Sequence, residues 1–166
     1  MKPQPRRQLQ GGPSPPWPNG FEKHRADTPP TGKNKRRAAP SLQGARVVIA
    51  EDQGMTQLQL RKILQFEGLN VVGTASTGKE AVDLVLKLRP DLVLMDVRMP
   101  EMDGLEASRQ ILKTYHVCIV ILTAFSDEEY QREALQLGIG SYVIKPVSSE
   151  TLIPQLARAY QRFSQH

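Results

Sequence analysis

The sequence lacks the features that mark membrane-spanning or disulfide-linked proteins. It contains one cysteine, so no disulfide can form within the chain. That residue, Cys118, lies in the apolar run YHVCIVIL, which predicts a buried thiol rather than a reactive one. No apolar stretch is long enough to span a bilayer. No apolar run follows Arg6 and Arg7, as it does in a secretory or twin-arginine signal. We therefore expect a cytoplasmic protein.

Acidic residues are scarce in the first 44 positions, which hold two of them against nine basic residues, a net charge of +7. Because the whole chain carries +5, residues 45–166 carry −2. The same segment contains nine of the thirteen prolines and almost no aliphatic side chains, so it cannot bury enough apolar surface to offset its conformational entropy. We predict a disordered tail at 1–44 and one folded domain at 45–166. The basic cluster at 33–37 could contact nucleic acid or acidic surfaces. The alternative, which we favour, is that it belongs to a solvated linker.

The remaining sequence alternates apolar runs of strand length with amphipathic helical segments. Strands are predicted at 47–50, 69–75, 92–95, 117–122 and 140–144. Helices are predicted to begin near Gly54, Thr77, Asp103, Ser126 and Thr151, the last with Pro154 in its first turn. Such alternation is typical of a parallel sheet covered by helices on both faces. We predict a flavodoxin-like (βα)5 three-layer α/β sandwich with strand order 2-1-3-4-5.

Acidic residues follow two of the predicted strands. Glu51 and Asp52 follow the first strand, and Asp96 follows the third. In the predicted strand order these two strands are neighbours, so the three carboxylates meet at one edge of the sheet. Carboxylates so close together raise one another's pKa values unless a cation offsets their negative charge, so we expect a cation here. Carboxylates with no histidine or cysteine nearby suit Mg²⁺, which prefers oxygen ligands.

Two further polar residues end the fourth and fifth predicted strands, Thr123 and Lys145. A hydroxyl and an ammonium group are donors suited to anionic oxygens. Together with a metal and carboxylates, they are the components of a phosphoryl-transfer site. Asp96 is the candidate nucleophile because the loop that begins with Met99 and Pro100 leaves it by itself at the strand end.

One glycine-rich segment has the spacing of a nucleotide-binding motif. Residues 73–79, GTASTGK, match the first seven positions of a P-loop. However, Glu80 stands where a P-loop has the serine or threonine that binds Mg²⁺, and Thr77 with Glu80 has the spacing of a helix capping box. We therefore predict a helix start here rather than a nucleotide site. The same spacing recurs at two more predicted helix starts, at Asp103 with Glu106 and at Ser126 with Glu129.

In combination, these residues resemble the receiver domains of two-component response regulators over residues 45–164. The motifs that carry the resemblance are Glu51-Asp52, Asp96 followed by Met99-Pro100 and Asp103-Gly104, Thr123-Ala124, and Lys145-Pro146. Each is weak alone, but their order at successive strand ends is specific. The resemblance implies that Asp96 accepts a phosphoryl group from a histidine kinase. It also implies that Asp52, Asp96 and the backbone carbonyl of Arg98 hold Mg²⁺, with Glu51 acting through water.

The resemblance further implies how a signal leaves the site. Lys145 and Thr123 would contact the acyl phosphate. Tyr142 matches the aromatic switch position, whose ring is expected to turn inward when Thr123 shifts toward the phosphoryl group. The face formed by the helix at 126–138, the strand at 140–144 and the last helix would bind a downstream protein or, when phosphorylated, a second copy.

The chain ends at His166, shortly after the last predicted helix, so we expect no DNA-binding output domain. Two alternatives remain. The domain could relay its phosphoryl group to a histidine phosphotransfer protein, or it could be a phosphatase of the aspartyl-phosphate type. The phosphatase needs a second aspartate two residues after the nucleophile, where Arg98 stands, and a guanidinium cannot act as that acid or base. We therefore expect a phosphoacceptor with self-phosphorylation and self-dephosphorylation only, not an enzyme.

Overall fold

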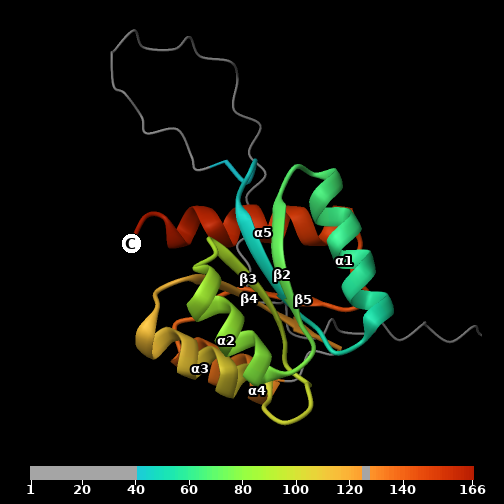
Figure 1. The fold of residues 1–166 in the computed structure, drawn as a ribbon. Coiled ribbons are helices and arrows are strands. Elements are labelled where there is room, and N and C mark those ends of the chain that lie inside the picture. Colours follow the sequence, from blue (N-terminus) through green and yellow to red (C-terminus); the bar gives the residue numbers. More distant parts are fainter. Residues whose placement is uncertain (1–40, 125–127) are drawn as a thin grey trace, which may run out of the picture. The chain divides into compact units, whose positions relative to one another are not determined.

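A computed structural model describes residues 41–124 and 128–166 of the chain, with five strands and five helices among them (Figure 1). The strands are β1 (Arg46–Ala50), β2 (Asn70–Ala75), β3 (Leu92–Asp96), β4 (Cys118–Thr123) and β5 (Tyr142–Ile144). The helices are α1 (Gly54–Phe66), α2 (Gly78–Leu88), α3 (Gly104–Thr114), α4 (Glu128–Gln136) and α5 (Ser149–Phe163). The predicted alternation of strands and helices is confirmed. No helix in the described ranges is both long and apolar enough to cross a membrane.

All neighbouring strands are parallel, in the order β2-β1-β3-β4-β5, which confirms the flavodoxin-like prediction. In this order β1 lies directly beside β3, and Ala50 pairs with Met95. The next residues along the two strands are Glu51 and Asp96. The register of this one strand pair therefore brings together the acids that sequence separates.

Both faces of the sheet are covered, as the uniformly apolar strands predict. Successive side chains of β1 point to opposite faces: Val47 and Ile49 belong to the core cluster that includes residues of α1 and α5, whereas Val48 and Ala50 belong to the cluster that includes residues of α2, α3 and α4. Figure 1 shows the two groups of helices on either side of the strands. The three-layer sandwich is thus confirmed.

The helix starts show how local hydrogen bonds set element boundaries. The Thr77 hydroxyl accepts the Glu80 N–H at 3.1 Å, and the Glu80 carboxylate accepts the N–H of Ser76 at 2.8 Å, one residue before the N-cap. Asp103 likewise accepts the Glu106 N–H at 2.8 Å, but the Glu106 carboxylate bonds to other side chains of α3. Both N-caps are confirmed, and in both the glutamate departs from the capping-box pattern.

The start of α5 differs from the prediction. Its N-cap is Ser148, which exchanges hydrogen bonds with Thr151, so Thr151 lies inside the helix. Pro154 therefore lies in the second turn, where it removes one helical hydrogen bond. The helix begins earlier because the hydroxyl of Ser148 accepts the backbone N–H of Thr151 and the hydroxyl of Thr151 accepts that of Ser148.

The chain enters the sheet through residues 41–44, which the sequence pattern assigned to the tail. The Gly44 N–H donates to the Gly68 carbonyl at 2.8 Å, and Leu42 packs against the core beneath α1 and α5. The folded part therefore includes these residues. The predictions for the tail up to residue 40 and for Ser126 lie outside the described residues.

Candidate functional site

The predicted acids meet at the carboxyl end of the two central strands. Glu51 and Asp52 follow β1, and Asp96 is the last residue of β3. One carboxylate oxygen from each lies within 4.8 Å of the others, and this is the only such group of metal-ligating side chains in the described ranges. All of its donors are oxygens, as the sequence predicted.

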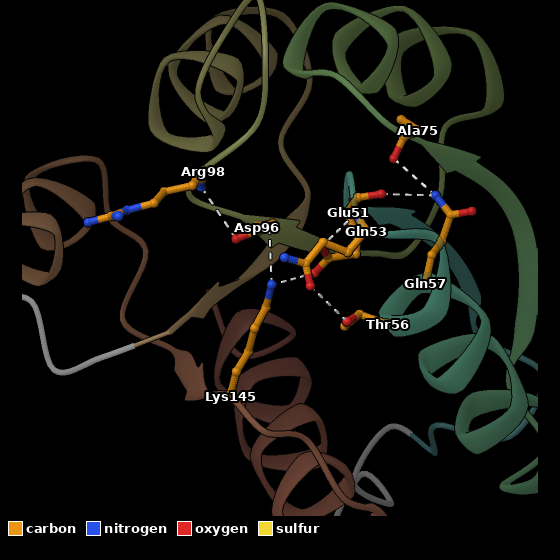
Figure 2. A network of polar contacts seen from close by, with 8 residues as sticks. All are labelled: Glu51, Gln53, Thr56, Gln57, Ala75, Asp96, Arg98 and Lys145. Atoms are coloured by element: carbon orange, nitrogen blue, oxygen red, sulfur yellow. Dashed lines mark hydrogen bonds and ion pairs between the residues drawn. The ribbon is translucent and has the colours of Figure 1, made fainter.

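Lys145 joins two of these acids, as Figure 2 shows. Its Nζ lies 2.6 Å from Glu51 Oε2 and 3.1 Å from Asp96 Oδ2. Glu51 is fully buried, and this burial raises the pKa of its carboxyl group. Burial opposes the charge of Lys145 too, but the hydrogen bond to Glu51 and the negative charge of Asp96 outweigh it, so the pKa of Lys145 is raised. Lys145 therefore remains protonated and supplies positive charge to both acids.

Asp96 is almost fully buried at the foot of the site, with 5% of its surface exposed. Its Oδ2 faces Lys145, and its Oδ1 accepts the Arg98 N–H at 3.3 Å. The Arg98 side chain extends away from the acids in Figure 2. The main-chain N–H of Arg98 therefore contacts Asp96, whereas a role of its carbonyl in holding a metal stays a prediction.

The loop after Asp96 is held by two close backbone approaches. The Gly104 N–H donates to the Val97 carbonyl at 2.8 Å, and the Gly78 N–H donates to the Met102 carbonyl at 3.1 Å. A Cβ atom at Gly104 would lie 1.9 Å from the carbonyl oxygen of Asp96, and one at Gly78 would lie 2.2 Å from that of Met102. The P-loop-like segment thus uses its last glycine to pack against the Asp96 loop.

A cavity of about 290 Å³ opens above the acids. The cavity is lined by Asp52, Asp96, Arg98, Thr123 and Lys145, among others. Of the residues predicted at this end of the sheet, only the buried Glu51 is absent from the cavity wall. The Asp52 side chain is exposed and has no hydrogen bond or ion pair to any residue in the described ranges. It is therefore available to a ligand.

Tyr142 lies apart from this cavity. It is 43% exposed at the start of β5 and borders a second cavity, of about 210 Å³, between α4 and strands β4 and β5. Thr123 and Tyr130 border both cavities. Thr123 is thus shared by the cavity of the acids and the cavity of Tyr142, and the switch itself stays a prediction.

One contributor to the site was missed from the sequence. The side-chain amide of Gln57 in α1 donates to the carbonyls of Glu51 and Ala75. A glutamine in the second turn of an amphipathic helix resembles an ordinary surface residue, and nothing in its sequence context marked it.

The chain belongs to the family of response regulator receiver domains: the model of that family matches residues 47–157. The resemblance inferred from the motifs is therefore confirmed, and with it a role in two-component signalling. The family match covers all the residues of the acidic site and every strand residue except Arg46.

Individual relatives support the same family. The transcriptional regulatory protein PdtaR of Mycobacterium tuberculosis is 42% identical over 118 residues, which are 71% of this chain and 58% of PdtaR. The chain thus spans less than two thirds of PdtaR. The chemotaxis protein CheY of Thermotoga maritima is 32% identical over 114 residues, 68% of this chain and 95% of CheY. A crystal structure of a CheX–CheY–BeF3–Mg²⁺ complex from Borrelia burgdorferi matches with a TM-score of 0.67 and 26% identity, covering 70% of this chain and 89% of that chain.

Proposed function

We propose that the domain is a phosphorylation-dependent switch in which Asp96 accepts a phosphoryl group from the phosphohistidine of a sensor histidine kinase. The observation that carries this proposal is the position of the Asp96 carboxylate, 3.1 Å from the Lys145 ammonium and within the acidic cluster. In the transfer, an Asp96 oxygen forms a bond to phosphorus while the P–N bond breaks and the departing imidazole takes up a proton. This role requires a cytoplasmic location, where the kinase presents its phosphohistidine.

The chemistry of the donor set fits Mg²⁺. The side chains of Asp52 and Asp96 and the carbonyl of Arg98 would hold the ion, and Glu51 would act through water. The ion would neutralise the acids and the phosphoryl oxygens. Lys145 brings a second positive charge to Asp96. The related CheY in complex with BeF3 and Mg²⁺ supports this chemistry for a protein of the same fold.

The output would pass through the surface formed by α4, β5 and α5. The half-exposed Tyr142 borders a cavity of about 210 Å³, which offers space for its ring when Thr123 shifts. Leu135 and Ile144 expose 62% and 45% of their surface on the same side, and exposed apolar groups favour protein contacts. A downstream protein, or a second phosphorylated copy, would bind there.

Phosphorylation can be tested with acetyl phosphate as a small-molecule donor. In the presence of Mg²⁺ we expect one phosphoryl group per chain by intact-protein mass spectrometry, removable by hydroxylamine as an acyl phosphate is. Asp96→Asn should incorporate none, and chelating the metal should prevent incorporation in the wild type. A phosphoryl group on another residue, or incorporation that does not need Mg²⁺, would contradict the proposal.

The relay alternative makes a different prediction about partners. Proteins could be captured with wild type and Asp96→Asn, each with and without beryllofluoride. A switch should enrich its partner only with beryllofluoride on the wild type. Transfer of the phosphoryl group to a histidine phosphotransfer protein would support the relay. Repeated turnover of a generic phosphate ester would support the phosphatase, against which the position of Arg98 argues.

A further inference from the structure

We infer that Gln57 is a positioning residue for the metal-binding acids, and this inference rests on the proposed function. Gln57 lies in α1 rather than in the acidic motif. Its Nε2 donates to the Glu51 carbonyl at 3.0 Å and to the Ala75 carbonyl at 3.3 Å, as Figure 2 shows. One side-chain amide thus ties α1 to the ends of β1 and β2 just where the acids begin.

The hydrogen bond to Glu51 fixes a particular peptide group. The Glu51 N–H donates to the Ala75 carbonyl at 3.0 Å, and its own carbonyl accepts from Gln57. That carbonyl belongs to the peptide bond between Glu51 and Asp52. Because a peptide group is planar, holding its oxygen also holds the direction in which the main chain enters Asp52.

Asp52 depends on this restraint more than Glu51 does. The Glu51 side chain is buried and bonded to Lys145 and to the N–H of Gln53. The Asp52 side chain is exposed and has no partner in the described ranges, so no side-chain contact restrains its carboxylate, and only the main chain from which it projects limits where it can lie. Loss of the Gln57 amide should therefore release Asp52 and weaken the metal site, because groups behind a ligand keep it oriented.

A second glutamine of α1 provides an internal comparison. The Nε2 of Gln59 donates at 3.0 Å to the carbonyl of Val147, two residues after Lys145. Residues two apart on a helix point to nearly opposite sides, so Gln57 reaches the loop of the acids and Gln59 reaches the loop of the lysine. Gln57 should affect the metal, whereas Gln59 should affect the anion that Lys145 contacts.

The experiment measures Mg²⁺ affinity by calorimetry on the full chain. Gln57→Met keeps the length of the side chain and removes both N–H donors. The matched control is Gln65→Met, on the same helix, because the Gln65 side chain is exposed and has no partner in the described ranges. We expect the Mg²⁺ dissociation constant to rise about 10-fold in Gln57→Met and to stay unchanged in Gln65→Met. Gln59→Met should keep its Mg²⁺ affinity and bind beryllofluoride more weakly at saturating Mg²⁺.

The outcomes separate this inference from the proposed function. If the wild type binds Mg²⁺ and a folded Gln57→Met binds it equally well, the inference fails and the proposed function stands. If Gln59→Met loses as much Mg²⁺ affinity as Gln57→Met, a general displacement of α1 explains both and the inference also fails. A wild type that binds no Mg²⁺ overturns both proposals.

A second variant covers the case in which Gln57→Met shows no cooperative unfolding transition. Gln57→Asn keeps an amide, but its side chain is one methylene shorter and cannot reach both carbonyls. It should lose Mg²⁺ affinity in the same direction while unfolding cooperatively. Wild-type affinity in Gln57→Asn would overturn the inference.

Discussion

The carboxyl ends and the amino ends of the parallel strands lie on opposite sides of the sheet. Each side has a cavity and a buried titratable group. At the amino end the cavity measures about 520 Å³ and is lined by Cys118, Arg162 and Phe163, among others. At the carboxyl end it measures about 290 Å³ and is lined by Asp52, Asp96 and further polar residues. The larger cavity is the one without clustered charge, so cavity size does not locate the chemistry.

Side chains at the amino end contact one another without a cluster of like charges among the residues that the structure describes. Arg162 donates to the Ser141 hydroxyl at 2.9 Å, and the ring of His116 stacks on Phe163 with centroids 4.5 Å apart. Burial raises the pKa of Cys118 to about 12, so its thiol stays protonated. At the carboxyl end, three acids form a cluster and one ammonium group pairs with two of them. The difference is that, in the described part of the chain, only the carboxyl end holds a cluster of acids with more negative than positive charge, which is why we propose the ligand there.

The largest effect on stability is expected from removing the cation of the carboxyl end. Lys145→Met leaves the fully buried Glu51 without its ion-pair partner, and unpairing a buried charge costs about 3 kcal/mol. Urea unfolding at neutral pH without Mg²⁺ measures the loss. Adding Glu51→Gln should restore much of it. At the amino end, Arg162→Met should cost less than about 1 kcal/mol because Arg162 is exposed. Equal losses at the two ends would remove the distinction between them.

A smaller effect is expected from adding one methyl group at each end. Gly104→Ala places a Cβ 1.9 Å from the carbonyl oxygen of Asp96, so the loop must move, at a cost of about 2 kcal/mol. Gly140→Ala is the control, because nothing lies within 4 Å of its added Cβ. Thermal unfolding reports the cost, and acetyl phosphate labelling should fall only in Gly104→Ala. Unchanged stability and labelling in Gly104→Ala would show that the loop tolerates the change.

The smallest effect at neutral pH is expected from Cys118→Ala, about 1 kcal/mol from the loss of a buried side chain, with no change in phosphorylation. The advantage of the wild type should shrink as pH rises from about 9 toward 12. In that range the unfolded thiol has lost its proton while the native thiol keeps it, so deprotonation favours the unfolded chain. Denaturant titrations of both proteins at several pH values measure this. Rapid modification of the native thiol at pH 8 would contradict the assigned burial.

Much of the fold and site could be predicted from local patterns. The acids, Thr123 and Lys145 each follow a short apolar run, and such a run predicts a buried strand whatever surrounds it. The start of α5 could not be predicted in this way, because Ser148 and Thr151 are both good caps and only their mutual hydrogen bonds decide between them. The support from Gln57 could not be predicted either, because its partners lie on two different strands.

The sequence by itself determined the type and order of the elements, because the period of apolar residues is a local property of the chain. It also determined which strands end in polar groups, and those motifs indicated the family. Only the tertiary structure decided that Lys145 neutralises Glu51, that Gln57 holds the peptide before Asp52, and that the larger cavity lies at the other end. The physical reason is the same in each case. These contacts join segments distant in sequence, so they depend on strand register and on how the helices pack against the sheet.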